Sequence, residues 1–156
     1  MFTIIEEYKR FRKVTFYTLR YEDSEFSETD KFIERFMNDE NYNVDLDEIF
    51  YQINDIGENS GAEQKYFRHE GKAEALPSKW SENRLRLYCI RLTDNIVILA
   101  NGGIKSSQTA QDSRDLSMKF HFANKAAHEI NKCINEGQIR INVGLSSLEG
   151  ESELYL

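Results

Sequence analysis

The sequence has few of the features that would mark a secreted, metal-binding or disordered protein. Its two cysteines, Cys89 and Cys133, lie far apart in apolar segments and do not form a metal-binding motif. One proline and eight glycines among 156 residues argue against disorder. There is no run of 18 or more apolar residues, and the first residues lack the apolar stretch of a secretory signal. We expect a single cytoplasmic domain over residues 1–156, without a membrane span and with reduced cysteines; a disulfide is the alternative.

Histidine is also scarce, and common motifs for metal or phosphate binding are absent. The three histidines, His69, His121 and His128, have no carboxylate or cysteine at metal-ligand spacing. The segment GGIKSS lacks the spacing of a phosphate-binding loop, so we expect Gly102 and Gly103 to form a turn with positive φ angles. We expect neither a metal ion nor a cofactor.

Negative charge prevails overall but is distributed unevenly along the chain. The formal net charge is −7, which by itself argues against a nucleic-acid partner. Residues 22–58, however, carry 13 acidic side chains against two basic ones, and residues 148–156 add three glutamates. The remainder of the chain is therefore basic. This separation indicates either a basic binding surface or ordinary solvated helix faces, and the sequence leaves both interpretations open.

Apolar patterning predicts strands and helices in the first half of the chain. Residues 14–21 are rich in β-branched and aromatic side chains and are expected to form a strand. Residues 4–12 could form a short helix or extend that strand. Ser27 is suited to cap a helix whose apolar residues recur at helical spacing, and a second amphipathic helix starts near Asp45. These two helices are expected to form a helical hairpin.

The second half of the chain predicts three strands, a long helix and one more strand. The strands are expected at 65–69, 85–92 and 96–100, the helix at about 117–135 with Ser117 as its cap, and the last strand at 139–143. A tight turn joins the second and third of these strands into a hairpin. The predicted fold class is α+β: a mostly antiparallel sheet with an N-terminal helical hairpin and a C-terminal helix on one face.

Several cationic side chains gather on the predicted hairpin. Arg84, Arg86 and Tyr88 are spaced two residues apart and would share one face of the strand. Arg91 needs a bulge or the hairpin end to join them, and Arg68 comes from the preceding strand. Guanidinium groups on one sheet face suit phosphate or RNA, so Arg84 and Arg91 are predicted to bind RNA. The alternative is that these arginines balance carboxylates on an exposed sheet face.

The most distinctive block of the sequence runs over about residues 65–135. It comprises YFRHEG, then RLRLYCIRLTDNIVILANGGIKSSQTAQDS, and then the closing helix. This block resembles the HigB-like branch of the RelE/ParE toxin superfamily. Arg68 and Arg86 match the two strand arginines of that branch, and residues 96–99 match its hydrophobic strand.

The lysine motif of that branch is matched by Gly103 to Ser107 together with Thr109. Lys105 stands at the first lysine position of the motif, and Ser106 stands where the family has a second lysine. The resemblance therefore implies that Lys105 takes part in the family's chemistry. The alternative is a solvated lysine at the tip of a turn.

The resemblance implies the toxin of a type II toxin–antitoxin pair, an endoribonuclease that cuts mRNA, often on the ribosome. In that chemistry the 2′-hydroxyl of the RNA attacks the adjacent phosphate, which requires proton transfer and cationic stabilisation of the developing charge. Arg68, Arg86 and Lys105 would be the cationic stabilisers, and His69 or Tyr88 would transfer protons. The implied partners are a cognate antitoxin protein and mRNA, with no membrane involved.

The acidic composition keeps a second hypothesis open. Members of this branch are typically basic, as binding to ribosomal RNA requires, whereas this chain is acidic. The alternative is a catalytically inactive RelE-like module that binds another protein of a mobile element or phage. A toxin should arrest growth when it is expressed alone, whereas a binding module should be harmless and should co-purify with a protein.

Overall fold

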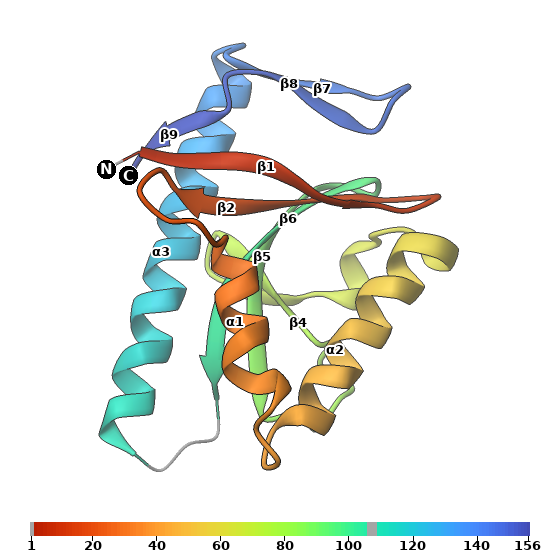
Figure 1. Ribbon diagram of the computed structural model, residues 1–156. Coiled ribbons are helices and arrows are strands. Elements are labelled where there is room, and N and C mark those ends of the chain that lie inside the picture. The colour runs from red at the N-terminus through yellow and green to blue at the C-terminus, as the bar shows by residue number, and fades with distance from the viewer. Residues whose placement is uncertain (1, 106–108) are drawn as a thin grey trace.

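A seven-stranded sheet forms the centre of the protein, and the computed structural model describes residues 2–105 and 109–156 (Figure 1). The strands of this sheet are β1 (Phe2–Arg10), β2 (Thr15–Tyr21), β3 (Arg68–Glu70), β4 (Ala73–Leu76), β5 (Leu85–Thr93), β6 (Ile96–Ile104) and β9 (Glu153–Tyr155). Their order is β3-β4-β5-β6-β2-β1-β9, and all neighbours are antiparallel except the parallel pair β2–β6. A separate two-stranded ribbon consists of β7 (Ile139–Asn142) and β8 (Ser147–Gly150).

Three α-helices occur in the described part of the chain. They are α1 (Glu28–Met37), α2 (Asn43–Asp55) and α3 (Ala110–Asn135). A π-helical turn (Ile56–Ser60) continues α2, and a 3₁₀ turn (Gln64–Tyr66) precedes β3. Within residues 2–105 and 109–156, no helix combines the length and the apolar character that crossing a membrane requires.

The chain begins with two strands, so the prediction of an N-terminal helical hairpin is wrong. β1 pairs antiparallel with β2, from Thr3 opposite Tyr21 to Arg10 opposite Thr15, and its other edge pairs with β9. Residues 4–12, for which helix and strand were both open, are strand as far as Arg10. The helices α1 and α2 follow β2. Pairing on both edges stabilises β1, and one of its partners lies at the other end of the sequence, which a local pattern does not reveal.

Helices cover both faces of the sheet, whereas the sequence predicted helices on one face (Figure 1). α3 packs on the face that carries Leu19, Tyr88 and Ile98, and α1 and α2 pack on the face that carries Phe16 and Val97. Successive residues of a strand point to opposite faces, so a strand covered on both sides reads as one apolar run. All nine residues of β6 are buried, which explains the run IVILA.

Capping groups set the starts of two helices. Ser27 caps α1 as predicted, because its hydroxyl accepts a hydrogen bond from the Asp30 backbone N–H at 3.0 Å. α3 starts earlier than predicted, because Thr109 and not Ser117 caps it, accepting from the Asp112 backbone N–H at 3.1 Å. The first turns of α3 are mostly polar, so they lack the apolar stripe from which the helix was predicted.

The sequence predicts the β5–β6 hairpin more accurately than the segment just before it. The predicted hairpin is confirmed as β5 and β6, although β6 continues to Ile104, and the predicted strands at 14–21 and 139–143 are confirmed as β2 and β7. The strand expected at 65–69 is instead the 3₁₀ turn followed by the short strand β3. The strands β4, β8 and β9 were not predicted.

α1 covers the edge of β6 beyond the residues that pair with β2. β2 and β6 pair over four residues. Beyond them, the Thr29 hydroxyl donates to the Ala100 carbonyl at 2.9 Å and shares a 2.6 Å hydrogen bond with the Thr18 hydroxyl. Arg35 of α1 then forms a 2.6 Å ion pair with Asp115 of α3. The last residues of β6 are thereby held between two helices.

Candidate functional site

The α3 face of the sheet brings together polar residues from neighbouring strands. Arg68 of β3 lies opposite Ala75 of β4, which lies opposite Tyr88 of β5. Glu70 lies two residues after Arg68, on the same face, opposite Ala73. Because the two alanines of β4 are small, Glu70 of β3 and Tyr88 of β5 line one cleft across them.

A cleft opens where these residues meet the beginning of α3. Its volume is about 330 Å³. Phe120 of α3 forms one wall and packs edge-to-face on Tyr88, with 5.9 Å between the ring centroids. The residues that line the cleft are Glu70, Tyr88, Ile104, Lys105, Ser113, Leu116, Ser117 and Phe120. Two of the predicted catalytic residues, Tyr88 and Lys105, therefore share one cavity.

Lys105 reaches this cleft from the end of β6. Its backbone N–H donates to the Arg84 carbonyl at 2.7 Å, and its side chain is exposed. Among the residues that the structure describes, its ammonium forms no hydrogen bond or ion pair. The next residues of the lysine motif, Ser106 and Ser107, lie outside the described residues. Within the described structure, the ammonium is therefore available to an anion.

Gly102 and Gly103 lie inside β6, so the prediction of a turn with positive φ angles is wrong. A Cβ atom on Gly102 would lie 1.7 Å from the Arg86 carbonyl oxygen. A Cβ atom on Gly103 would lie 3.0 Å from a carboxylate oxygen of Asp115. Glycine is needed here because β5 and α3 approach β6 closely, and not because the chain turns.

Burial and neighbouring charges control protonation around the cleft. The pKa of the Tyr88 phenol is raised to about 12, chiefly by burial and also by the Glu70 carboxylate, while the Arg86 guanidinium lowers it. Burial lowers the pKa of Arg86, the nearby Arg68 charge lowers it further, and Glu70 and Tyr88 raise it. At neutral pH Tyr88 is therefore a phenol that can donate a proton or a hydrogen bond. The cleft combines this phenol with a carboxylate and an ammonium.

Arg68 and Arg86 lie beside the cleft with their guanidinium groups bound to main-chain carbonyls. Arg86 is buried, and its Nη1 donates to the carbonyls of Asn83 and Leu85, both at 2.7 Å. Arg68 donates to three carbonyls of the loop 77–81 at 2.9 to 3.0 Å. Both arginines therefore fix β5 and the loop before it, in addition to bringing positive charge to the site.

His69 does not line the cleft that Tyr88 and Lys105 share. It is exposed and points to the opposite side of β3 from Arg68, as strand alternation requires. Its partner across the strand pair is Glu74 of β4. This placement separates His69 from Tyr88 and Lys105.

Arg84 and Arg91 are also engaged elsewhere. The Arg84 guanidinium forms a 3.0 Å ion pair with Asp45 near the start of α2, on the side of the sheet away from α3. Arg91 donates to the Ala62 carbonyl at 2.6 Å and forms an ion pair with Asp94 near the β5–β6 turn. The Arg84 guanidinium therefore does not join Arg86 and Tyr88 on one face as predicted. The Arg91 guanidinium, which needed a bulge or the hairpin end to join them, is bound near the β5–β6 turn.

Glu70 is the cleft residue that sequence reasoning missed. It stands two residues after Arg68 in the segment YFRHEG, so the alternation used for the other strand residues could have placed it on the same face. Ser113 and Ser117 also line the cleft. Ser113 comes from the first turns of α3, where the sequence has no apolar pattern that predicts a helix, and Ser117 was predicted only as the cap of the helix.

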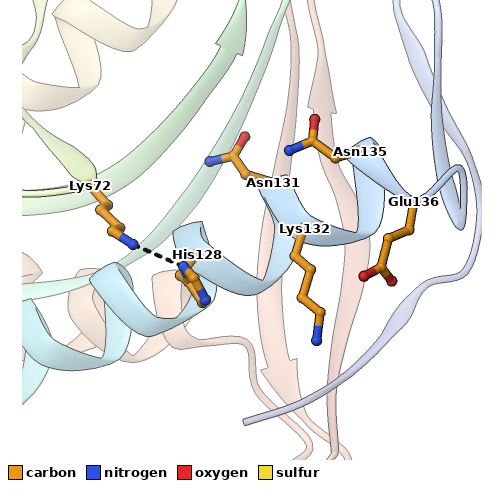
Figure 2. A pocket seen from close by; sticks show the side chains of 6 residues that line it. All are labelled: Lys72, His128, Asn131, Lys132, Asn135 and Glu136. Atoms are coloured by element: carbon orange, nitrogen blue, oxygen red, sulfur yellow. Dashed lines mark hydrogen bonds between the residues drawn. The ribbon is translucent and has the colours of Figure 1, made fainter.

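A larger cleft of about 540 Å³ lies farther along α3 (Figure 2). Its lining residues are Lys72, His128, Asn131, Lys132, Asn135 and Glu136. The Lys72 ammonium lies 2.9 Å from His128 Nδ1, within hydrogen-bond distance. In Figure 2 the side chains of Lys132 and Glu136 point away from this pair and do not converge on one point. This cleft is a polar surface of α3, separate from the cleft of Lys105.

No protein-family model, curated protein or solved structure matches this chain. The functional interpretation therefore depends on the geometry of the Lys105 cleft and on the chemistry of the side chains that line it.

Proposed function

We propose that this protein is the toxin of a type II toxin–antitoxin pair and cleaves mRNA in the cytoplasm, free or on the ribosome. The observation that carries the proposal is the single cleft lined by the Lys105 ammonium, the Glu70 carboxylate and the Tyr88 phenol. An endoribonuclease that uses the 2′-hydroxyl of its substrate needs a base, an acid and a cation at one phosphate. These three side chains supply one group of each kind, so no metal ion is required by the scheme.

The reaction follows from the roles of the three groups. Glu70 takes the proton of the 2′-hydroxyl, and the 2′-oxygen attacks the adjacent phosphorus while the bond to the 5′-oxygen breaks. The leaving 5′-oxygen receives a proton from Tyr88, whose pKa of about 12 keeps the phenol protonated at neutral pH. Lys105 stabilises the charge on the non-bridging oxygens. The products are a 2′,3′-cyclic phosphate and a 5′-hydroxyl, and Glu70 returns its proton to Tyr88 through solvent.

Arg86 and Arg68 support this chemistry from the wall of the cleft. The Arg86 charge lowers the pKa of Tyr88 against the effect of burial, which favours proton transfer from the phenol. The positions that carry the resemblance to RelE/ParE toxins, which are Arg68, Arg86 and Lys105, all lie at or beside this cleft. That common location supports the proposal. The partner protein is an antitoxin that covers the cleft.

A binding module without nuclease activity is the second candidate function, and one observation favours it. The guanidinium groups are bonded to carbonyls or carboxylates of the protein itself in Arg68, Arg84, Arg86 and Arg91. The described part of the chain therefore presents less open positive charge to RNA than the sequence suggests. In this alternative, the protein binds another protein and does not cleave RNA.

Growth after induced expression in a bacterial host distinguishes the two functions. Wild-type protein should arrest growth, and Lys105→Ala should restore it, because the substitution removes the cation at the phosphate while leaving an exposed position that folding does not need. Lys72→Ala removes a lysine from the cleft in Figure 2 and is the matched control; it should still arrest growth. Normal growth with soluble wild-type protein would contradict the toxin proposal and favour the binding module.

A further inference from the structure

Beside the Lys105 cleft lies a second cleft, at β3, the outer strand of the sheet. Its volume is about 490 Å³, and Glu70 lines both this cleft and the Lys105 cleft. Its lining includes Lys65, Arg68, His69 and Lys79, and Glu70 is the one carboxylate among the described residues that line it. In a chain of net charge −7, this is a local excess of basic side chains.

Trp80 forms an exposed aromatic wall of this second cleft. The residue is 65% exposed, although its large apolar ring favours burial. Its loop is nevertheless fixed, because Arg68 donates to three carbonyls of residues 77–81. Lys79 Nζ lies 5.6 Å from the centroid of the indole. An exposed indole on a fixed loop, with a lysine beside it, is suited to a planar ligand that carries negative charge.

We propose that this second cleft binds the single-stranded RNA that flanks the cleavage site. A base stacks on Trp80, and Lys65 and Lys79 bind the phosphates next to it. Single strands are bound in this way because every base has a flat face to stack and every phosphate attracts a cation. Lys65 is paired with Glu63 at 3.3 Å on an exposed surface, and a phosphate can replace such a pair. The inference rests on the proposed function, since one strand would pass through both clefts.

The charges on the other side of Trp80 determine where the strand lies. Another cleft, of about 380 Å³, borders Trp80 on its other side, and its lining includes Glu48 and Asp55 of α2. These carboxylates repel phosphates, whereas the lysines lie on the side that leads to Glu70. The bound strand is thereby directed from Trp80 toward the candidate active site and away from α2.

The test uses Trp80 as its own reporter, because it is the single tryptophan of the chain. The full chain is titrated with a 2′-O-methyl RNA decamer, which lacks the attacking hydroxyl and cannot be cleaved. Tryptophan fluorescence should be quenched on binding. Anisotropy of the same decamer carrying a dye should show that Trp80→Ala weakens binding by about tenfold or more. Lys65→Ala combined with Lys79→Ala should reduce the slope of log affinity against log salt concentration by about 1.4.

Matched variants and a separate activity assay keep the outcomes distinct. Lys72→Ala combined with Lys132→Ala, in the cleft of Figure 2, should leave both the affinity and the salt slope unchanged. The inference would be overturned if Trp80→Ala bound the decamer with unchanged affinity. It would also be overturned if a poly-glutamate peptide displaced the decamer as effectively as RNA does. If the protein cleaves RNA but Trp80 makes no contribution to RNA binding or cleavage, the inference is overturned and the proposed function stands. Binding through Trp80 without cleavage would instead overturn the proposed function alone.

Discussion

Arg68 and Arg86 donate to main-chain carbonyls, whereas the Lys105 ammonium makes no hydrogen bond among the described residues. A planar guanidinium with five N–H donors can bind several carbonyls at once, and an ammonium on a flexible stem can follow a phosphate as it reacts. The two arginines therefore organise β5 and its loop. Lys105 is the cation that we expect to meet the substrate.

Glu74 of β4 gives a pH-dependent prediction for stability. Burial raises its pKa, and the Arg91 N–H, the Arg91 charge and His69 oppose the rise without cancelling it. A carboxyl whose pKa is higher in the folded state costs stability once it is ionised. Glu74→Gln should therefore be more stable than wild type at pH 7, as measured by thermal unfolding. The difference in stability between Glu74→Gln and wild type should disappear as the pH falls through the raised pKa of Glu74 and then below about 4.3, the ordinary pKa of a glutamate in an unfolded chain.

An exposed carboxylate provides the control for that measurement. Glu25→Gln, on the surface before α1, should show no comparable gap between pH 7 and pH 4. Equal stability of Glu74→Gln and wild type at pH 7 would show that the buried environment does not penalise the charge of Glu74.

Strand β6 shows which part of the candidate site could be predicted from sequence. Its apolar run and the tight turn before it identified the β5–β6 hairpin, and alternation placed Arg86 and Tyr88 on one face. The continuation of β6 through Gly102 and Gly103 could not be predicted, because its cause lies in the close approach of β5 and α3. The first turns of α3, which supply Ser113 to the cleft, were not predicted because they are mostly polar.

The close contact between β5 and β6 can be tested by substitution. Gly102→Ala would place its Cβ 1.7 Å from the Arg86 carbonyl oxygen, so the two strands must separate. We expect the free energy of unfolding to fall by about 3 kcal/mol or more in chemical denaturation. Gly144→Ala is the control, because its Cβ would lie 3.6 Å from its nearest neighbour, an ordinary contact. A loss in Gly102→Ala no larger than in Gly144→Ala would contradict the strand register described above.

The sheet separates two differently charged parts of the molecule. The acidic segment 22–58 contains α1 and α2, which pack on the face opposite the one that carries Tyr88. The Lys105 cleft and the cleft lined by Lys65, Lys79 and Trp80 draw their cations from the basic remainder of the chain. The negative net charge is therefore compatible with a local site for RNA, and the acidic helices are available to a basic protein partner.

The architecture could be predicted where contacts are local in sequence and not where they are distant. The Ser27 cap and the β5–β6 hairpin depend on neighbouring residues, and both were identified. β1 pairs with β9 from the other end of the chain, and β2 pairs with β6 in parallel. Neither pairing can be read from the local spacing of apolar residues in the sequence. For that reason residues 4–12 were left open between helix and strand, and the covering of both sheet faces by helices was not foreseen.

RNA cleavage by purified protein in a translating bacterial extract, with analysis of the product ends, tests the central claim most directly. Wild type should yield 2′,3′-cyclic phosphate and 5′-hydroxyl ends, and an RNA with a 2′-deoxy nucleotide at the cleavage position should stay intact. Glu70→Gln and Lys105→Ala should each slow cleavage by about 100-fold or more. Intact RNA with wild-type protein, or undiminished cleavage by both variants, would contradict the assignment of the Lys105 cleft as the active site.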